Sequence, residues 1–217
     1  MNTLAINTAL PFTEIALLHE DKPVESVSWQ SNFNESEKVL PELQKIIAAH
    51  GPGIDRVFVV TGPGSFTGLR IGITIANTLA YALKKPIIGM NTFDYLSAKI
   101  GDLALAIVLR AGGGKLAIKL PGQDGHSFLE KSALSAFLAD LHGLKGVVTD
   151  MRDLDKDHLA LPNGVDWIGF DALPSMAQVL CDVILSTDSV DLPAHDQVKP
   201  VYLSAPHITE SKKPLFT

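Results

Sequence analysis

The fold of this chain is decided by the stretch Val59-Val60-Thr61-Gly62-Pro63-Gly64-Ser65-Phe66-Thr67-Gly68-Leu69-Arg70-Ile71-Gly72-Ile73. It contains the end of an apolar strand, a glycine-rich turn and the start of a helix. Gly62, Pro63, Gly64 and Gly68 fix an unusual backbone path between the two elements, so we expect them to form a structural turn. The helix, predicted over residues 69–83, carries no charge between Arg70 and Lys84. A helix that is apolar on nearly all sides must be covered on nearly all sides, which points to a partner as well as a sheet.

The elements around this stretch follow a recognisable order. Apolar patterning predicts strands over residues 4–9, 14–19, 24–30, 56–61 and 86–90, and helices over 36–50, 69–83 and 91–100. Three strands joined by short turns form a meander, and the later strands alternate with helices. That order is typical of the ribonuclease-H-like half of an actin-like ATPase fold.

We therefore expect an α/β protein with an actin-like, two-lobed fold, in which mixed sheets carry helices on both faces. The predicted domains are a ribonuclease-H-like lobe over residues 1–100 and a smaller, degenerate copy of it over residues 101–217, with the boundary at Gly101. In the second half the patterns predict a hairpin over 103–120, helices over 132–141 and 173–185, and strands over 147–149, 166–170 and 198–203.

Composition restricts the class of protein. The chain has 217 residues, 46% of them hydrophobic, a net charge of −6 and a pI of about 5.6. Its single cysteine excludes an intrachain disulfide. No uncharged apolar run reaches the roughly 18 residues of a membrane span, and the first residues do not have the pattern of a signal peptide. We therefore expect a cytoplasmic protein that does not bind a membrane. The acidic balance indicates that any contact with RNA is indirect.

Candidate catalytic and ligand-binding residues are few. The glycine-rich turn could bind phosphate at a helix N-terminus, but it matches neither the P-loop nor the dinucleotide fingerprint, and close helix packing is the favoured interpretation. Asn7 lies in the first predicted strand, where actin-like ATPases carry an aspartate of the metal–nucleotide site, but a turn residue is the favoured interpretation. Ser65 lacks the elbow pattern of a nucleophile, the histidines lack metal-ligand spacing, and the acidic loop over residues 150–157 is interpreted as a solvated surface.

Small residues in the apolar helix indicate where a partner could approach. Gly72, Ala76 and Ala80 recur every four residues and form a row against which a second helix can pack closely. The alternative is packing against the chain's own sheet or first helix. The predicted partner interface takes residues from both helices: Val39, Leu43, Leu69, Gly72, Ile73, Ala76, Leu79 and Ala80.

The stretch from Gly62 to Gly72 resembles the signature of the bacterial TsaB (YeaZ) proteins, once labelled glycoprotease-like or peptidase M22-like. The opening Leu4-Ala5-Ile6-Asn7-Thr8-Ala9 is similar to that family's first strand, which usually carries aspartate where Asn7 stands. Further resemblance lies in Val39-Leu40-Pro41, in Pro86-Ile87-Ile88-Gly89-Met90-Asn91-Thr92 and in Pro200-Val201-Tyr202-Leu203.

The resemblance implies a non-catalytic scaffold subunit that pairs with the paralogue TsaD, joined by the small ATPase TsaE, in the synthesis of threonylcarbamoyladenosine beside the tRNA anticodon. It also implies pairing or homodimer formation through the helices over 36–50 and 68–83. No cofactor of its own is expected, although ATP or ADP at the interface with TsaD stays open. The alternatives are an ATPase or kinase of the actin-like fold and, least favoured, a peptidase.

Overall fold

The computed structural model describes residues 1–20, 22–31, 35–51, 53–151, 153–156, 158–186 and 194–204. Its first sheet has six strands in the order β11-β5-β4-β1-β2-β3. These strands are β1 (Asn2–Asn7), β2 (Phe12–His19), β3 (Lys22–Gln30), β4 (Arg56–Gly62), β5 (Ile87–Asn91) and β11 (Ala194–His195). The three-strand meander is antiparallel, whereas β4 runs parallel to β1 and β5 parallel to β4.

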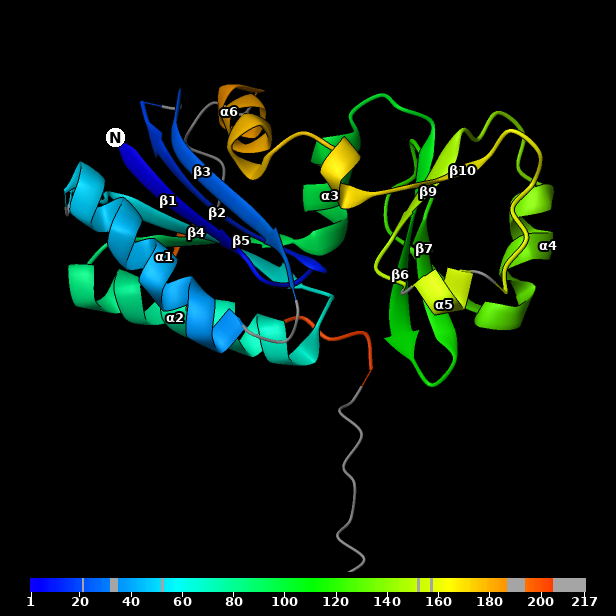
Figure 1. Ribbon diagram of the computed structural model, residues 1–217, viewed down its shortest axis with the longest axis horizontal. Coiled ribbons are helices and arrows are strands. Elements are labelled where there is room, and N and C mark those ends of the chain that lie inside the picture. The colour runs from blue at the N-terminus through cyan, green and yellow to red at the C-terminus, as the bar shows by residue number, and fades with distance from the viewer. Residues whose placement is uncertain are drawn as a thin grey trace, which may run out of the picture.

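Helices cover both faces of the first sheet (Figure 1). Below it lie α1 (Glu35–His50) and α2 (Phe66–Leu83), and above it lie α3 (Thr92–Ile100) and α6 (Met176–Ser186). Because both faces are covered, the central strand β4 is buried along its whole length and reads as a continuous apolar run. We call this sheet and its four helices the first lobe.

The second sheet repeats the strand order of the first. Its order, β10-β9-β6-β7-β8, matches β5-β4-β1-β2-β3 strand for strand. The strands are β6 (Leu105–Gly112), β7 (Lys115–Lys119), β8 (Ser127–Glu130), β9 (Gly146–Thr149) and β10 (Asp166–Ile168). Together with α4 (Leu134–Ala139) and α5 (Asp153–Lys156) they form the second lobe.

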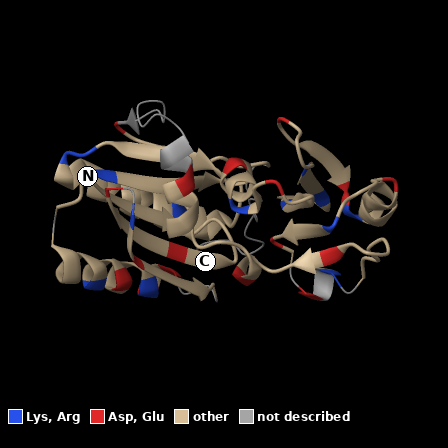
Figure 2. Ribbon diagram, turned by 90° about the horizontal axis from the view of Figure 1, so that it is seen from above, with Lys and Arg blue, Asp and Glu red and all other residues tan. Residues whose placement is uncertain are grey.

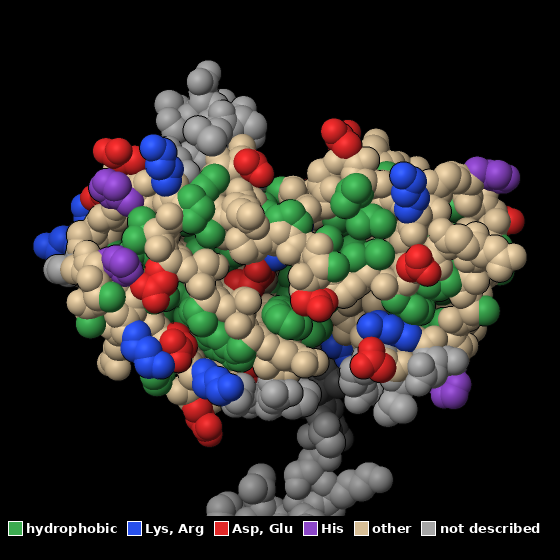
Figure 3. All heavy atoms as spheres, turned by 45° about the horizontal axis from the view of Figure 1, so that its top comes forward, with side chains coloured by type: hydrophobic (Ala, Val, Ile, Leu, Met, Phe, Trp, Pro, Cys, Tyr) green, Lys and Arg blue, Asp and Glu red, His purple; other side chains and the backbone are tan. Residues whose placement is uncertain are grey.

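The fold is the predicted one: an actin-like α/β protein with mixed sheets. The degenerate copy over residues 101–217 stays a prediction, although the two sheets share a strand order. The chain returns to the first lobe after building the second, because α6 packs on β2 and β3 and β11 joins β5. The boundary at Gly101 stays a prediction. In the space-filling view a notch separates the two lobes (Figure 3).

Alternate residues of β6 belong to two different cores. Leu105, Ile107 and Leu109 share the main core with α3 and α6, so the two lobes are packed together through α3. Ala106 and Val108 face the opposite way, into a smaller core that α4 covers. Period-two alternation in a strand covered on both faces produces this division.

Several element predictions need correction. The sequence patterns miss β8, whose side chains are largely exposed, and the short helix α5. A strand was expected over residues 198–203, but this segment runs without ladder pairing in the structure. The 3.6-residue periodicity of the apolar positions in α1 predicts that Leu40 is buried with Val39, Leu43 and Ile46, yet 49% of its surface is exposed, while the other three are buried.

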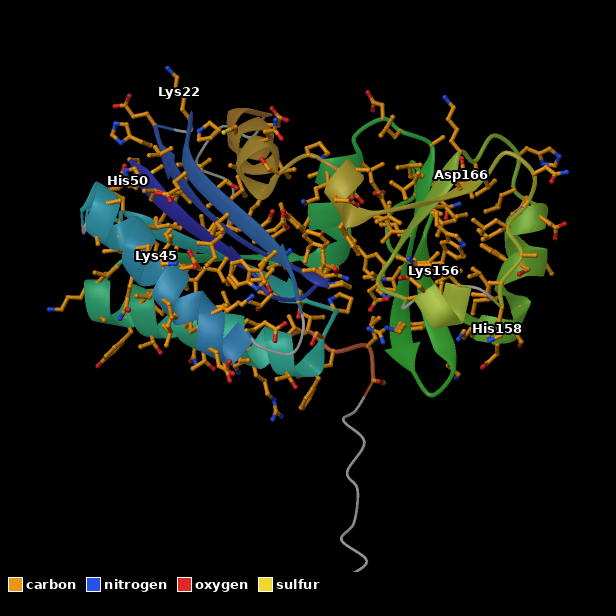
Figure 4. The ribbon with its side chains drawn as sticks, viewed as in Figure 1. Lys22, Lys45, His50, Lys156, His158 and Asp166 are labelled. Atoms are coloured by element: carbon orange, nitrogen blue, oxygen red, sulfur yellow. The ribbon has the colours of Figure 1, made fainter. Side chains whose placement is uncertain are left out.

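Charges are distributed over both lobes, with Lys and Arg interspersed among Asp and Glu (Figure 2). Some of them tie elements together at the surface. His50, at the end of α1, lies 2.6 Å from a carboxylate oxygen of Glu25 on β3 (Figure 4). Within the described ranges, no helix combines the length and the hydropathy that a membrane crossing requires.

Candidate partner-binding surface

The glycine-rich turn is built by close approach of backbone to backbone. A Cβ on Gly64 would overlap the carbonyl of Ala9, and one on Gly68 would overlap the carbonyl of Thr8. Gly62 adopts a φ of +105°, and the bond from Gly62 to Pro63 is cis. Glycine is therefore required here because the turn presses against the end of β1.

The polar groups of the turn are used within the chain. The Ser65 N–H donates to the Ala9 carbonyl at 2.8 Å, and the Gly68 N–H donates to the Ser65 hydroxyl at 3.2 Å. The Thr8 hydroxyl donates to the Gly68 carbonyl at 2.7 Å. Two of the N–H groups at this N-terminus are thus engaged within the chain, which favours the structural interpretation. Ser65 is the N-cap of α2.

The row of small residues on α2 faces the chain's own sheet. A Cβ on Gly72 would overlap the Thr8 hydroxyl, and Ala76 and Ala80 are buried. Most of the predicted interface residues share this inward position: Val39, Leu43, Leu69, Gly72, Ile73, Ala76 and Ala80 are buried, and Leu79 is partly buried. Buried side chains do not touch a partner, so of the predicted residues only Leu79 is available, and pairing through these helices would otherwise use other residues.

The outward side of α2 is less apolar than its sequence suggests. Thr67, Arg70, Thr74 and Thr78 are exposed along it, so the helix does have a polar row. The expectation that it must be covered on nearly all sides was too strong. Apolar surface nevertheless remains. We call it the helix-pair patch: the exposed Leu40, Phe66 and Tyr81, with the partly buried Ile47, Ile71, Ile75 and Leu79.

Asn7 lies in a buried polar network on the opposite face of the sheet. Its amide nitrogen donates to Glu14 at 3.0 Å, and its amide oxygen accepts from the Ala9 N–H at 3.0 Å. Glu14 also accepts from the Tyr95 hydroxyl at 2.7 Å and pairs with Lys99 at 2.7 Å. Burial, together with the charge of Glu14, raises the pKa of Tyr95 well above its ordinary value.

These contacts bear on the metal–nucleotide site that the fold implies. Hard cations prefer carboxylate ligands with free lone pairs. Glu14 is the carboxylate beside Asn7, and its two oxygens already accept from Lys99, Tyr95 and Asn7. Both amide atoms of Asn7 are also engaged. The residues at this end of β1 therefore do not fit a metal-bound nucleotide. In the described part of the chain no group of three or more potential metal ligands comes together.

One carboxylate was misjudged from the sequence. Asp150 was included in a solvated acidic loop, but only 5% of its surface is exposed. It accepts from the backbone N–H of Arg110 at 2.8 Å and from the Arg110 guanidinium at 3.3 Å. Burial raises the pKa of Asp150, and Arg110 opposes that rise. Asp150 directly follows the apolar strand β9, and this position could have indicated an inward side chain.

Comparison with known proteins finds relatives of this chain. Residues 31–119, which contain α1, the glycine-rich turn and α2, match the family model described as TsaD: tRNA N6-adenosine threonylcarbamoyltransferase. The tRNA threonylcarbamoyladenosine biosynthesis protein TsaB of Bacillus subtilis (strain 168) is 35% identical over 101 residues, or 45% of this chain and 44% of that protein. TsaB of Escherichia coli (strain K12) is 36% identical over 95 residues, or 42% and 41% of the two chains. The chain is a homologue of the TsaB (YeaZ) proteins.

The matches in sequence cover part of each chain. In these alignments the chain spans less than half the length of the curated relatives it matches. The fold extends further: YeaZ from Pseudomonas aeruginosa superposes with a TM-score of 0.68 over 93% of this chain and 99% of that chain, at 18% identity. The architecture of both lobes is therefore shared with YeaZ, at low overall identity.

Proposed function

We propose that this chain is a non-catalytic partner subunit for a TsaD paralogue in the synthesis of threonylcarbamoyladenosine in tRNA. The observation that carries the proposal is the helix-pair patch. It lies on α1 and α2, within the region that matches the TsaD family model. Exposed aromatic side chains of this kind are enriched at the centres of protein interfaces.

The chemistry of the first lobe supports a binding role. The Ser65 and Gly68 N–H groups are engaged by the turn, and Glu14 is neutralised by Lys99, so neither position is prepared for phosphate or metal. Pairing through the helix-pair patch would leave the buried network around Glu14 intact, because that network lies on the opposite face of the sheet. A homodimer through the same patch, and the ATPase TsaE as a third subunit, belong to the same proposal.

Light-scattering chromatography of the chain alone and mixed with the TsaD paralogue tests the proposal. We expect a one-to-one complex with the wild-type chain. Tyr81, which is 85% exposed on α2, provides the informative variant. Tyr81→Asp should weaken association by about tenfold or more, the effect of losing an interfacial aromatic anchor.

Phe128→Asp provides the matched control. Phe128 is an exposed aromatic residue, 55% exposed, but it lies on β8 of the second lobe. This variant should bind like the wild type. If the wild-type chain does not associate with TsaD, with or without ATP, the proposed function is wrong. If both variants weaken binding equally, the interface does not lie on the helix pair.

A further inference from the structure

The segment from Val198 to Ser204 crosses from one lobe to the other. It is drawn in orange-red in Figure 1 and passes between the lobes on the side away from α3. Its first part is held by the first lobe. The Val198 N–H donates to the Asn77 side-chain oxygen at 3.0 Å, and the Asn77 amide nitrogen donates to the Val198 carbonyl at 2.9 Å. Asn77 lies on α2, so this pair of bonds fixes the segment to that helix.

The middle of the segment follows the glycine-rich turn. The Val201 N–H donates to the Thr61 carbonyl at 2.8 Å, and a Cβ on Gly62 would overlap the Val201 carbonyl. The ring of Tyr202 lies 5.1 Å from the ring of Phe66, at the first residue of α2. The segment is therefore seated on the same turn that closes against β1.

The end of the segment reaches the second lobe. Gly112, at the tip of the β6–β7 hairpin, adopts a φ of +81°, and a Cβ on it would come within 2.7 Å of the Ser204 hydroxyl. The segment thus packs against the first lobe at Asn77, Thr61 and Phe66 and against the second lobe at Gly112.

Two of the contacts between the lobes lie on opposite sides. On one side α3 packs against β6, where Asp94 lies 3.3 Å from Lys119 and Phe93 stacks on His126 at 4.6 Å. On the other side lies the segment from Val198 to Ser204. Two packed bodies joined along one element can open about that element like a hinge, and a tie on the far side limits the opening.

We propose that residues 198–204 form a strap that holds the two lobes together opposite the α3 hinge, and that Asn77 positions it. This inference does not depend on the proposed function, because it concerns the chain alone. Loss of the strap lets the lobes separate about α3 while each sheet stays folded.

Spin-label distances between the lobes test the strap in the full-length chain. With Cys181 replaced by serine, single cysteines at Gln44 on α1 and Ala136 on α4, both exposed, carry the labels. Asn77→Ala removes both bonds to Val198. We expect a longer-distance population that is about 5- to 30-fold larger than in the parent protein, since that range corresponds to the loss of one or two weak interactions.

Thr78→Ala is the matched control, because Thr78 is the next residue of the same helix and is exposed. It should leave the distance distribution unchanged. Tyr202→Ala removes the ring contact with Phe66 without altering α2, so it provides a second test should Asn77→Ala unfold. Unchanged distances in both strap variants, with far-UV circular dichroism preserved, would overturn the proposal.

Discussion

Replacing Lys99 by methionine is expected to lower the free energy of unfolding by about 3–5 kcal/mol. Lys99 lies on α3 and its ammonium group is 2.7 Å from Glu14 on β2. The side chains are only 3% and 8% exposed. Methionine keeps most of the volume and removes the charge, so the variant leaves a buried carboxylate without its cation.

The size of the effect follows from what remains around Glu14. The Asn7 amide and the Tyr95 hydroxyl still donate to it, which offsets part of the desolvation cost and favours the lower end of the range. The ammonium group also donates to the Pro174 carbonyl at 2.9 Å, in the segment that leads into α6. That carbonyl loses its partner as well. For a chain of this size about 3–5 kcal/mol corresponds to a fall of roughly 6–20 °C in Tm.

Urea unfolding followed by circular dichroism measures this change. The double variant Lys99→Met with Glu14→Gln should recover most of the lost stability, because it removes the unpaired charge. Lys119→Met is the control: Lys119 lies 3.3 Å from Asp94, whose side chain is 62% exposed, so this variant should cost at most about 1 kcal/mol. A cost below about 1 kcal/mol for Lys99→Met, with no recovery in the double variant, would refute the reasoning.

Three further predictions concern α2, its N-terminal cap and the second lobe. Gly72→Ala should lower the free energy of unfolding by about 1–3 kcal/mol, because its methyl group would overlap the Thr8 hydroxyl, and denaturant titration would detect the loss. Ser65→Ala removes the acceptor for the Gly68 N–H and should cost about 1 kcal/mol in the same titration; an unchanged midpoint would argue against the cap. Asp150→Asn should become more stable relative to the wild type as the pH rises above about 4, because the raised pKa of Asp150 makes its ionisation unfavourable to the folded state. Urea titrations at several pH values measure the free energy of unfolding of both proteins. A difference between them that does not change with pH would contradict this prediction.

The first lobe could be predicted from the sequence because its local signals agree with one another. The apolar run of β4, the glycine-rich turn and the periodicity of α1 all favour the same strand order. The predicted burial of Leu40 is wrong because five large apolar residues lie close together in α1, and periodicity does not decide which of them face inward.

The candidate site was harder to predict because the direction in which its side chains face depends on contacts with residues distant in sequence. Small residues on α2 are consistent with a partner helix or with the chain's own sheet. The choice is made by Thr8, about 60 residues earlier in the chain. The network around Asn7 joins β1, β2 and α3 and has no local signature either. The extended course of residues 198–203 looks like a strand because hydrogen bonds to Asn77 and Thr61 replace a ladder.

The late return of the chain to the first sheet has a consequence for synthesis on the ribosome. The strands β1 to β5 and three helices are complete when Ile100 has been made, but the face of β2 and β3 that α6 covers stays open until Ser186 follows. About 86 residues separate these points, which corresponds to roughly 4–17 s of translation. During that interval the apolar residues of this face are uncovered, so the nascent first half is the stage at which exposed apolar surface favours aggregation.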